Sequence, residues 1–216
     1  MLVAAGRGER LGLDRPKAFA PLRGRPLLAE SLERLEGSEW IESIVVVAPE
    51  SWEEPAILLA EELGCGKVAA VVAGGPTRGE SVALGVAEVP EEAAVLLVHD
   101  AARPVLPDEV IERVLRPLSE GWDGVVPALR LSDTVKRVRA EQVLETLPRD
   151  ELVRVQTPQA FVAAALRSAL GAGDAGASDC SSLVEARGGR VRVVEGDPRL
   201  LKVTTAEDLA LVESLL

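Results

Sequence analysis

The chain has 216 residues, which suits one sizeable domain, and its 47 % hydrophobic content excludes a disordered protein. A formal net charge of −11 argues against a general nucleic-acid or anionic-membrane binder, so any bound anion needs a local cationic site. No apolar run reaches the ~18 residues of a membrane-spanning helix, and no signal peptide is expected. The two cysteines match no metal spacing, and we expect reduced thiols in a cytoplasmic protein.

Apolar runs and helical patterns alternate along the chain. We expect strands over residues 1–5, 43–49, 68–75, 94–100, 123–129 and 190–196. Between them we expect helices over residues 26–35, 53–63, 79–88, 107–118 and 161–170. A C-terminal helix follows, and a capping-box pattern at Thr204 and Glu207 marks its start. The runs are continuous, which is typical of strands covered on both faces. We therefore predict an α/β fold, a three-layer sandwich around a mostly parallel, Rossmann-like sheet.

The segment 131–161 departs from this alternation. It is β-branched and charged, and TVKRVRAEQVLETL nearly alternates, which predicts an exposed antiparallel ribbon. Its apolar positions Val143, Leu144 and Leu147 need a cover, which a partner subunit would supply. We therefore expect a single domain over 1–216, with 131–152 as a protruding β-arm that makes a homodimer.

The first strand leads into a glycine-rich loop, VAAGRGERLGLDRPKAF. Gly6 and Gly8 begin a spacing close to the dinucleotide fingerprint, but the third glycine comes one residue late and Pro16 would break the helix that should follow. We instead predict a loop that wraps an anion with backbone N–H groups, with Arg10 and Lys17 adding positive charge. The alternative is a solvated turn with incidental arginines.

A buried run ends at Asp100, where ligands of open α/β sheets bind. Its carboxylate could hold Mg²⁺ that bridges nucleotide phosphates, or it could only cap the turn into Ala101. Arg103 nearby suits an anion. His99, the only histidine, could be a general base, but a structural role is favoured because phosphoryl chemistry need not use a base.

Two further groups of residues are candidates for ligand contacts. Arg78 and Ser81, in GGPTRGES, could approach a base or ribose, or this could be an ordinary strand-to-helix turn. Arg149, Thr134 and Lys202 suggest a second anion site, although surface cations are usually only solvated.

Seven collinear blocks resemble a known family. They are AAGRGERLGLDRPKAFAPLRGRPLL (4–28), GGPTRGESVALGV (74–86), VHDAARP (98–104), SDTVKRV (132–138), RVQTPQAF (154–161), SDCSSLVEARG (178–188) and LKVTTAEDLAL (201–211). Together they resemble the nucleotidyltransferases that make activated sugars and polyols, and among these the cytidylyltransferases that act on 2-C-methyl-D-erythritol 4-phosphate in the non-mevalonate isoprenoid pathway. Two positions depart from the family pattern: Cys180 stands where a second acid is usual, and Leu200-Leu201 replaces the frequent Asn-Ile before Lys202.

The resemblance implies roles for individual residues. Catalysis falls to Arg10, Lys17, Arg149 and Lys202. Nucleotide binding falls to Ala4, Ala5, Gly6, Gly8, Gly75, Ser81, Asp100 and Ala101, with Ser81 near the cytosine. The polyol phosphate meets Arg103, Thr134, Thr157 and Ser178, with the ribbon reaching over from the other subunit. Asp100 also holds the divalent cation, Mg²⁺ or another.

The implied reaction transfers a cytidylyl group from CTP to the polyol phosphate and releases pyrophosphate. A phosphate monoester with a second pKa of about 6 is already ionised at neutral pH, so neither a protein nucleophile nor a base is required. Fixed cations and Mg²⁺ would carry the catalysis. Alternatives are a cytidylyltransferase for another polyol phosphate such as ribitol 5-phosphate, a dinucleotide-dependent oxidoreductase, and a non-catalytic nucleotide-binding module. Pro16, the displaced glycine and the lack of a second-strand acid disfavour the oxidoreductase.

Overall fold

A central eight-stranded sheet organises the computed structural model of the chain, which describes residues 1–6, 8–171 and 179–216. Its strands are β1 (Leu2–Val3), β4 (Ile44–Ala48), β5 (Val68–Ala73), β6 (Val95–Asp100), β7 (Gly124–Arg130), β10 (Val153–Val155), β11 (Gln159–Val162) and β12 (Val191–Glu195). They follow the order β10-β7-β11-β6-β1-β4-β5, with β12 also on β7. The pairs β1–β4, β1–β6, β4–β5 and β7–β12 are parallel, whereas β10 and β11 run antiparallel to their neighbours.

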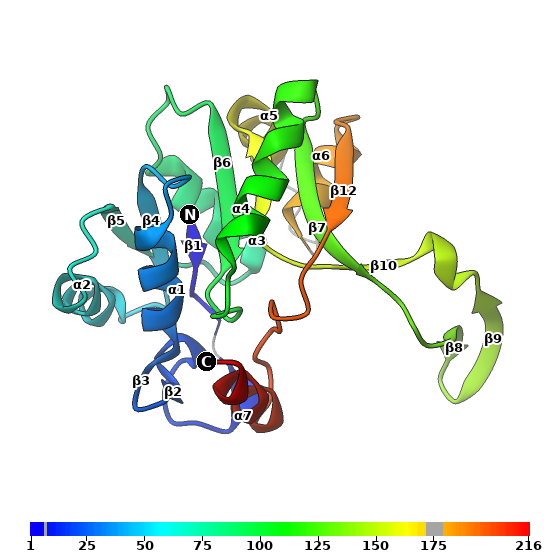
Figure 1. Ribbon diagram of the computed structural model, residues 1–216, viewed down its shortest axis with the longest axis horizontal. Helices are drawn as coiled ribbons and strands as arrows, with labels where there is room; N and C mark the ends of the chain where they lie inside the picture. The colour runs from blue at the N-terminus through cyan, green and yellow to red at the C-terminus, as the bar shows by residue number, and fades with distance from the viewer. Residues whose placement is uncertain (7, 172–178) are drawn as a thin grey trace.

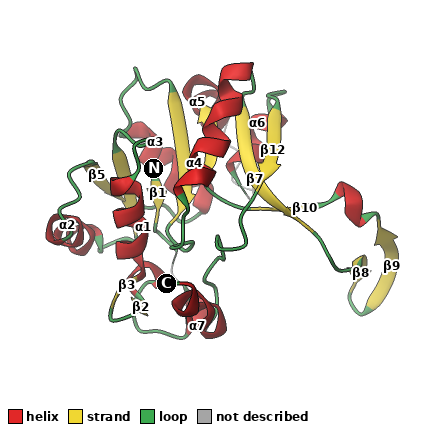
Figure 2. Cartoon of the chain, in the orientation of Figure 1, coloured by secondary structure: helices red, strands yellow, loops and turns green. Residues whose placement is uncertain are grey.

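Helices cover both faces of this sheet, as Figures 1 and 2 show. The helices are α1 (Leu27–Gly37), α2 (Glu53–Glu62), α3 (Arg78–Ala87), α4 (Asp108–Leu115), α5 (Ala163–Leu170), α6 (Cys180–Ala186) and α7 (Ala206–Leu215). One core cluster joins α1, α2 and α4 to the sheet, and another joins α3, α5 and α6 to it. All five residues of β4 in the middle of the sheet are buried, whereas most residues of β5 at its edge are half-buried. The predicted three-layer α/β sandwich is confirmed.

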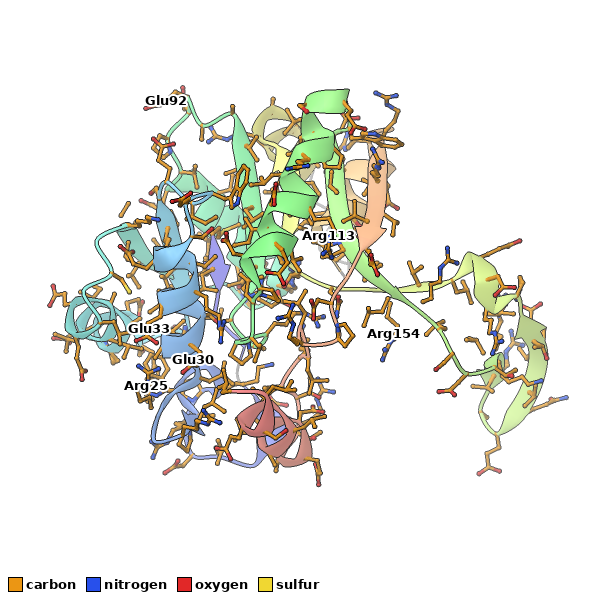
Figure 3. The ribbon with its side chains drawn as sticks, viewed as in Figure 1. Arg25, Glu30, Glu33, Glu92, Arg113 and Arg154 are labelled. Carbon is orange, nitrogen blue, oxygen red and sulfur yellow. The ribbon has the colours of Figure 1, made fainter. Side chains whose placement is uncertain are left out.

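A small third cluster ties the C-terminal helix to the start of the chain. Val212 of α7 packs with Leu22, Val105 and Val203. Leu22 belongs to a short hairpin of β2 (Pro21–Leu22) and β3 (Arg25–Pro26). Arg25 fastens this hairpin to α1 through ion pairs with Glu30 and Glu33, at 2.7 and 2.8 Å (Figure 3). The segment before α7 is thereby fixed against the body of the protein.

The β-arm is a separate hairpin of β8 (Val135–Arg139) and β9 (Gln142–Leu147), which pair only with each other. It stands away from the body at the end of β7 and β10 (Figure 1). Of the three expected apolar positions, Val143 and Leu144 are 53 and 46 % exposed, whereas Leu147 is half-buried; Val138, which was not expected, is 58 % exposed. The ribbon is shorter than 131–161, however, because β10 and β11 return to the central sheet.

Three local expectations differ from the structure. Helix α5 begins at Ala163 rather than at 161, because Phe161 is fully buried in β11. The last helix is capped by Thr205 with Asp208, one residue later than the expected Thr204 and Glu207. The short helix α6 lies where the sequence pattern predicted no element. Within the described ranges, no helix has the length and apolar character needed to cross a bilayer.

Candidate active site

A cleft of about 1040 Å³ opens where the parallel strands end. Its walls come from the segments that follow the carboxyl ends of four strands: 4–6 after β1, 49–52 after β4, 74–78 after β5 and 101–102 after β6. The cleft is also lined by residues 9 and 13–18 of the opening loop, and by Ser81, Asp100 and Lys202. This is the edge at which open α/β sheets bind ligands. The predicted position of the site is therefore matched by a cavity.

Two glycines allow the loops of the cleft to touch. At Gly74 a Cβ would lie 2.3 Å from the Ala5 Cβ and 2.9 Å from the Ser81 Oγ, so a side chain would push these loops apart. Gly8 adopts a left-handed φ of +74°, and a Cβ there would lie 2.6 Å from the Lys17 Cβ. The opening loop thus folds back on itself and fixes the base of the Lys17 side chain.

Asp100 is the buried anion at the centre of the cleft. Arg78 Nη2 donates to its Oδ1 at 3.0 Å, and Lys202 Nζ donates to its Oδ2 at 2.7 Å. Burial alone would raise the pKa of Asp100, but the two cations outweigh it and hold this pKa well below its usual range. Asp100 is therefore ionised at every physiological pH, and it holds the Arg78 and Lys202 side chains in the cleft.

Lys17 faces this cluster from the opening loop. Burial and the positive charge of Lys202 lower the pKa of Lys17 to about 8, although Asp100 acts in the opposite direction. Arg10 and Arg103 repel the Lys17 ammonium as well. These cations repel one another around a partly buried lysine, and a bound polyanion would offset this repulsion.

His99 lies directly under the cleft. Its side chain is fully buried, its Nδ1 is 3.2 Å from the Thr157 hydroxyl and its Nε2 is 3.1 Å from the Arg103 carbonyl oxygen. Burial lowers the pKa of His99 to about 4. With both ring nitrogens occupied by protein groups, the imidazole is not presented to the cleft. The geometry agrees with the structural role that we favoured over a general base.

The structure brings together most of the residues predicted for the nucleotide. The predicted residues that line the cleft are Ala4, Ala5, Gly6, Lys17, Gly75, Ser81, Asp100, Ala101 and Lys202. Arg10, Gly8, Arg103 and Thr157 lie next to it without lining it. Thr134 and Arg149 lie at the foot of the β-arm, where the Arg149 guanidinium donates to the Ser132 carbonyl. Ser178 lies outside the described residues.

The chain matches one protein family over its whole length. The sequence model of 2-C-methyl-D-erythritol 4-phosphate cytidylyltransferase matches residues 1–216. The chain belongs to this family. The cytidylyltransferase of Saccharopolyspora erythraea is 44 % identical over 220 residues, which cover 100 % of this chain and 97 % of that protein.

Solved structures of the cytidylyltransferase family share the fold. The crystal structure of the Thermus thermophilus 2-C-methyl-D-erythritol 4-phosphate cytidylyltransferase is 31 % identical, with a TM-score of 0.79 over 100 % of this chain and 97 % of that one. The 4-diphosphocytidyl-2C-methyl-D-erythritol synthase of Anaerococcus prevotii is 26 % identical, with a TM-score of 0.85 over 99 % and 93 %. The expected resemblance and the enzyme class, a nucleotidyltransferase, are thereby confirmed.

Among the described acidic residues that line the cytidylyltransferase cleft, Asp100 is the buried one. Within residues 1–6, 8–171 and 179–216, no group of three or more His, Cys, Asp or Glu side chains could hold a metal. Mg²⁺ is commonly bound through one or two carboxylates, with substrate phosphates and water completing its shell. Asp100 suits this pattern as a protein ligand, with a triphosphate supplying other oxygens, but both of its oxygens accept from Arg78 and Lys202, so one of these two cations would have to move aside for the metal.

Sequence reasoning did not anticipate the partner of Arg78. We expected this arginine near the base or ribose, but its guanidinium bonds Asp100 and, through Nη1, lies 3.4 Å from the Cys180 Sγ. Burial raises the pKa of the Cys180 thiol, so the group stays neutral. An acid at this position, as the family usually has, would compete with Asp100 for Arg78. The presence of Cys180 leaves Asp100 as the carboxylate partner of Arg78.

Proposed function

We propose that the cleft carries out the transfer of a cytidylyl group from CTP to 2-C-methyl-D-erythritol 4-phosphate, the activity that the family's description names. The observation that carries the proposal is the group of Lys17, Lys202 and Arg78 around the buried carboxylate of Asp100, at the carboxyl edge of the sheet. An acidic protein that gathers cations there is built to hold a polyanion. CTP and the polyol phosphate are both polyanions.

In the reaction, an oxygen of the substrate phosphate attacks the α-phosphorus of CTP. A new O–P bond forms, the bond from the α-phosphorus to the bridging oxygen breaks, and pyrophosphate leaves. Lys17 and Arg10 stabilise the charge on the α-phosphoryl oxygens and on the leaving group. Lys202 and Arg149 hold the attacking phosphate in line. Because that phosphate is already ionised near neutral pH, no residue needs to remove a proton.

A divalent cation, which we take to be Mg²⁺, is the proposed cofactor. Asp100 would hold this ion, which would supply positive charge to neutralise part of the phosphate charge. The other contacts to the nucleotide are assigned to the backbone and small side chains of Ala4, Ala5, Gly75 and Ser81, which line the cleft. Small residues there let a ribose and base come close to the main chain.

The proposed active unit is a homodimer joined through the β-arm. The exposed Val138, Val143 and Leu144 would be covered by the partner, since an isolated two-stranded hairpin is marginal in water. Thr134 and Arg149 would then reach the cleft of the other subunit, together with Arg103 of that subunit's own chain. We take the setting to be the cytoplasm, consistent with the buried free thiols of Cys65 and Cys180.

Pyrophosphate release tests this function. The purified chain is incubated with Mg²⁺, each of the four ribonucleoside triphosphates and a panel of polyol phosphates. We expect release only with CTP and 2-C-methyl-D-erythritol 4-phosphate. Equal turnover of ribitol 5-phosphate would contradict the assignment of 2-C-methyl-D-erythritol 4-phosphate as the substrate. NADH consumption with a polyol would contradict the transferase activity.

Arg10→Ala and Arg149→Ala should separate the two anion sites. Arg10 acts next to Lys17, so its loss should weaken CTP binding. Arg149 belongs to the arm, so its loss should leave CTP affinity nearly unchanged while raising KM for the polyol phosphate or lowering kcat. Calorimetric titration of both variants with CTP measures the difference. An equal loss of CTP affinity in both would mean that one anion site serves both substrates.

The pH dependence of kcat/KM for CTP should report Lys17. The ammonium is charged below its pKa of about 8 and neutral above it, so kcat/KM should fall as pH rises through this value. A Lys17→Arg variant keeps its charge at any pH, so its slower reaction should show no such fall. The two profiles are compared between pH 7 and 10, because the phosphate substrates are ionised throughout. The same fall in both enzymes would assign the ionisation to another group.

A further inference from the structure

His99 connects two parts of the active site that lie far apart in the sequence. Its Nε2 faces the carbonyl oxygen of Arg103 at 3.1 Å, and its Nδ1 faces the hydroxyl of Thr157 at 3.2 Å. The same hydroxyl oxygen accepts a hydrogen bond from the backbone N–H of Asp100 at 3.0 Å. All three partners belong to the proposed site or border it.

The chemistry of these partners fixes the position of each hydrogen. A carbonyl oxygen can only accept, so Nε2 of His99 must carry the hydrogen and donate to Arg103. Among the described contacts of the Thr157 hydroxyl, Nδ1 of His99 is the only acceptor for its hydrogen, so Nδ1 keeps its lone pair and the ring carries one hydrogen, on Nε2. The hydrogen bonds therefore run in one direction, from Asp100 N–H to the Thr157 oxygen, from Thr157 to Nδ1, and from Nε2 to Arg103.

The consequences reach the other side of the cleft. Arg103 Nη1 donates to the Leu200 carbonyl at 2.6 Å, and Val203 N–H donates to the Ala102 carbonyl at 2.8 Å. The segment that carries Lys202 is thus attached to the turn whose Arg103 carbonyl His99 holds. Lys202 in turn bonds Asp100, whose own backbone Thr157 holds. The contacts therefore form a closed circuit that begins and ends at the His99 imidazole.

We infer that His99 is a positioning residue, which acts as a neutral Nε2–H imidazole and aligns Asp100 and Arg103 through its two ring nitrogens. The inference rests on the proposed function for its kinetic part only. It also changes the role expected for Thr157. Because its hydroxyl hydrogen is given to His99, Thr157 has none to donate to a substrate phosphate, and its remaining lone pair can only accept from a polyol hydroxyl.

Nitrogen NMR of the intact chain tests the tautomer without any substitution. His99 is the only histidine, so ¹⁵N-histidine labelling gives a single imidazole whose two nitrogens need no assignment between residues. At pH 7 we expect Nε2 to carry the hydrogen and Nδ1 to show the shift of an unprotonated nitrogen. A hydrogen on Nδ1, or an imidazolium with both, would overturn the inference. This readout is independent of catalysis, so it stands or fails separately from the proposed function.

Two matched variants separate the two contacts kinetically. The amide of His99→Asn lies near the Nδ1 position and can accept from Thr157, but it loses Arg103. The amide of His99→Gln reaches the Nε2 position and can donate to Arg103, but it loses Thr157. Losing one such bond is expected to cost up to about ten-fold. We expect His99→Asn to raise KM for the polyol phosphate and His99→Gln chiefly to lower kcat, with CTP affinity kept in both. Wild-type kinetics in both would refute the positioning role.

Thr157→Val supplies a further check. It removes the hydroxyl at nearly constant volume, so it breaks both the bond to His99 Nδ1 and the bond from the Asp100 N–H, and it should lower kcat at least as much as His99→Gln. In the double variant with His99→Gln the loss should equal that of Thr157→Val alone, because the bond that His99→Gln breaks is then already absent. Additive losses would show that the Thr157 hydroxyl acts on the substrate independently of His99. A wild-type chain without transferase activity would instead disprove the proposed function and leave the NMR result untouched.

Discussion

Lys17→Ala is expected to lower kcat by ~10²–10³-fold, because one fixed charge next to the reacting phosphoryl group is lost. CTP should still bind, since the backbone of the opening loop and the neighbouring cations remain. The depressed pKa of Lys17 reflects how little solvent and how many positive charges surround the ammonium. Such a group gains most when negative charge grows next to it, as it does on the α-phosphoryl oxygens during transfer. Pre-steady-state and steady-state kinetics with CTP at saturation give kcat directly.

Arg15→Ala is the matched control for this variant. Arg15 belongs to the same loop and also lines the cleft, but its side chain is 49 % exposed and pairs with Asp14, so its charge is better screened by water than that of Lys17. Removing it changes the charge of the loop by the same amount as removing Lys17. A far smaller drop in kcat is expected. If the two variants lost equal activity, the general charge of the loop would account for the effect and Lys17 would have no special role.

Mixing Lys17→Ala with Arg149→Ala should restore activity that neither protein has alone. If Arg149 serves the partner's cleft, a mixed dimer holds one site with Lys17 from one chain and Arg149 from the other. Random re-association of equal amounts should then return about a quarter of the wild-type activity per chain. The variants are unfolded and refolded together, and pyrophosphate release is assayed with sedimentation of the same sample.

Lys17→Ala mixed with Arg10→Ala is the control for this experiment. Both of these residues belong to one opening loop, so no exchange of subunits can rebuild an intact site. Recovery with the first pair but not with the second would assign Arg149 to the partner's cleft. A dimer with no recovery in either mixture would assign Arg149 to its own chain, and a fully active monomer would disprove the coupling of assembly to activity.

Local patterns were enough to predict the body of the fold. Continuous apolar runs such as 44–48 are buried on both faces in a parallel sheet, and their β-branched composition and alternation with helical patterns indicate this. Alternation with high charge likewise predicted the hairpin of β8 and β9. It failed for 153–161, because β10 and β11 are short strands whose pairing with β7 depends on distant residues. Helix α6 is similarly short, and its cap by Asp179 involves a side chain with many competing uses.

The sequence was enough to predict many residues of the candidate site, but not which of their side chains contact one another. Glycines and cations directly after a strand indicate an anion site, whatever the path of the rest of the chain. That Arg78 bonds Asp100, however, depends on how α3 and β6 lie against each other in space. The same holds for His99, whose partner Arg103 follows β6 and whose partner Thr157 lies in the connection between β10 and β11. Sequence spacing carries no information on such contacts.

The cleft brings together segments that meet only in the completed fold, since Gly74 touches Ala5 and Lys202 bonds Asp100. An unfolded chain offers a nucleotide nothing comparable. By mass action, a ligand present at 100 times its Kd would therefore favour the folded body by ~2.7 kcal/mol. The hairpin of β8 and β9 pairs only with itself and supplies none of the described lining residues. A bound nucleotide should therefore stabilise the body against local unfolding without stabilising the hairpin. The local stability of the body then depends on the nucleotide, and that of the hairpin on the proposed partner subunit.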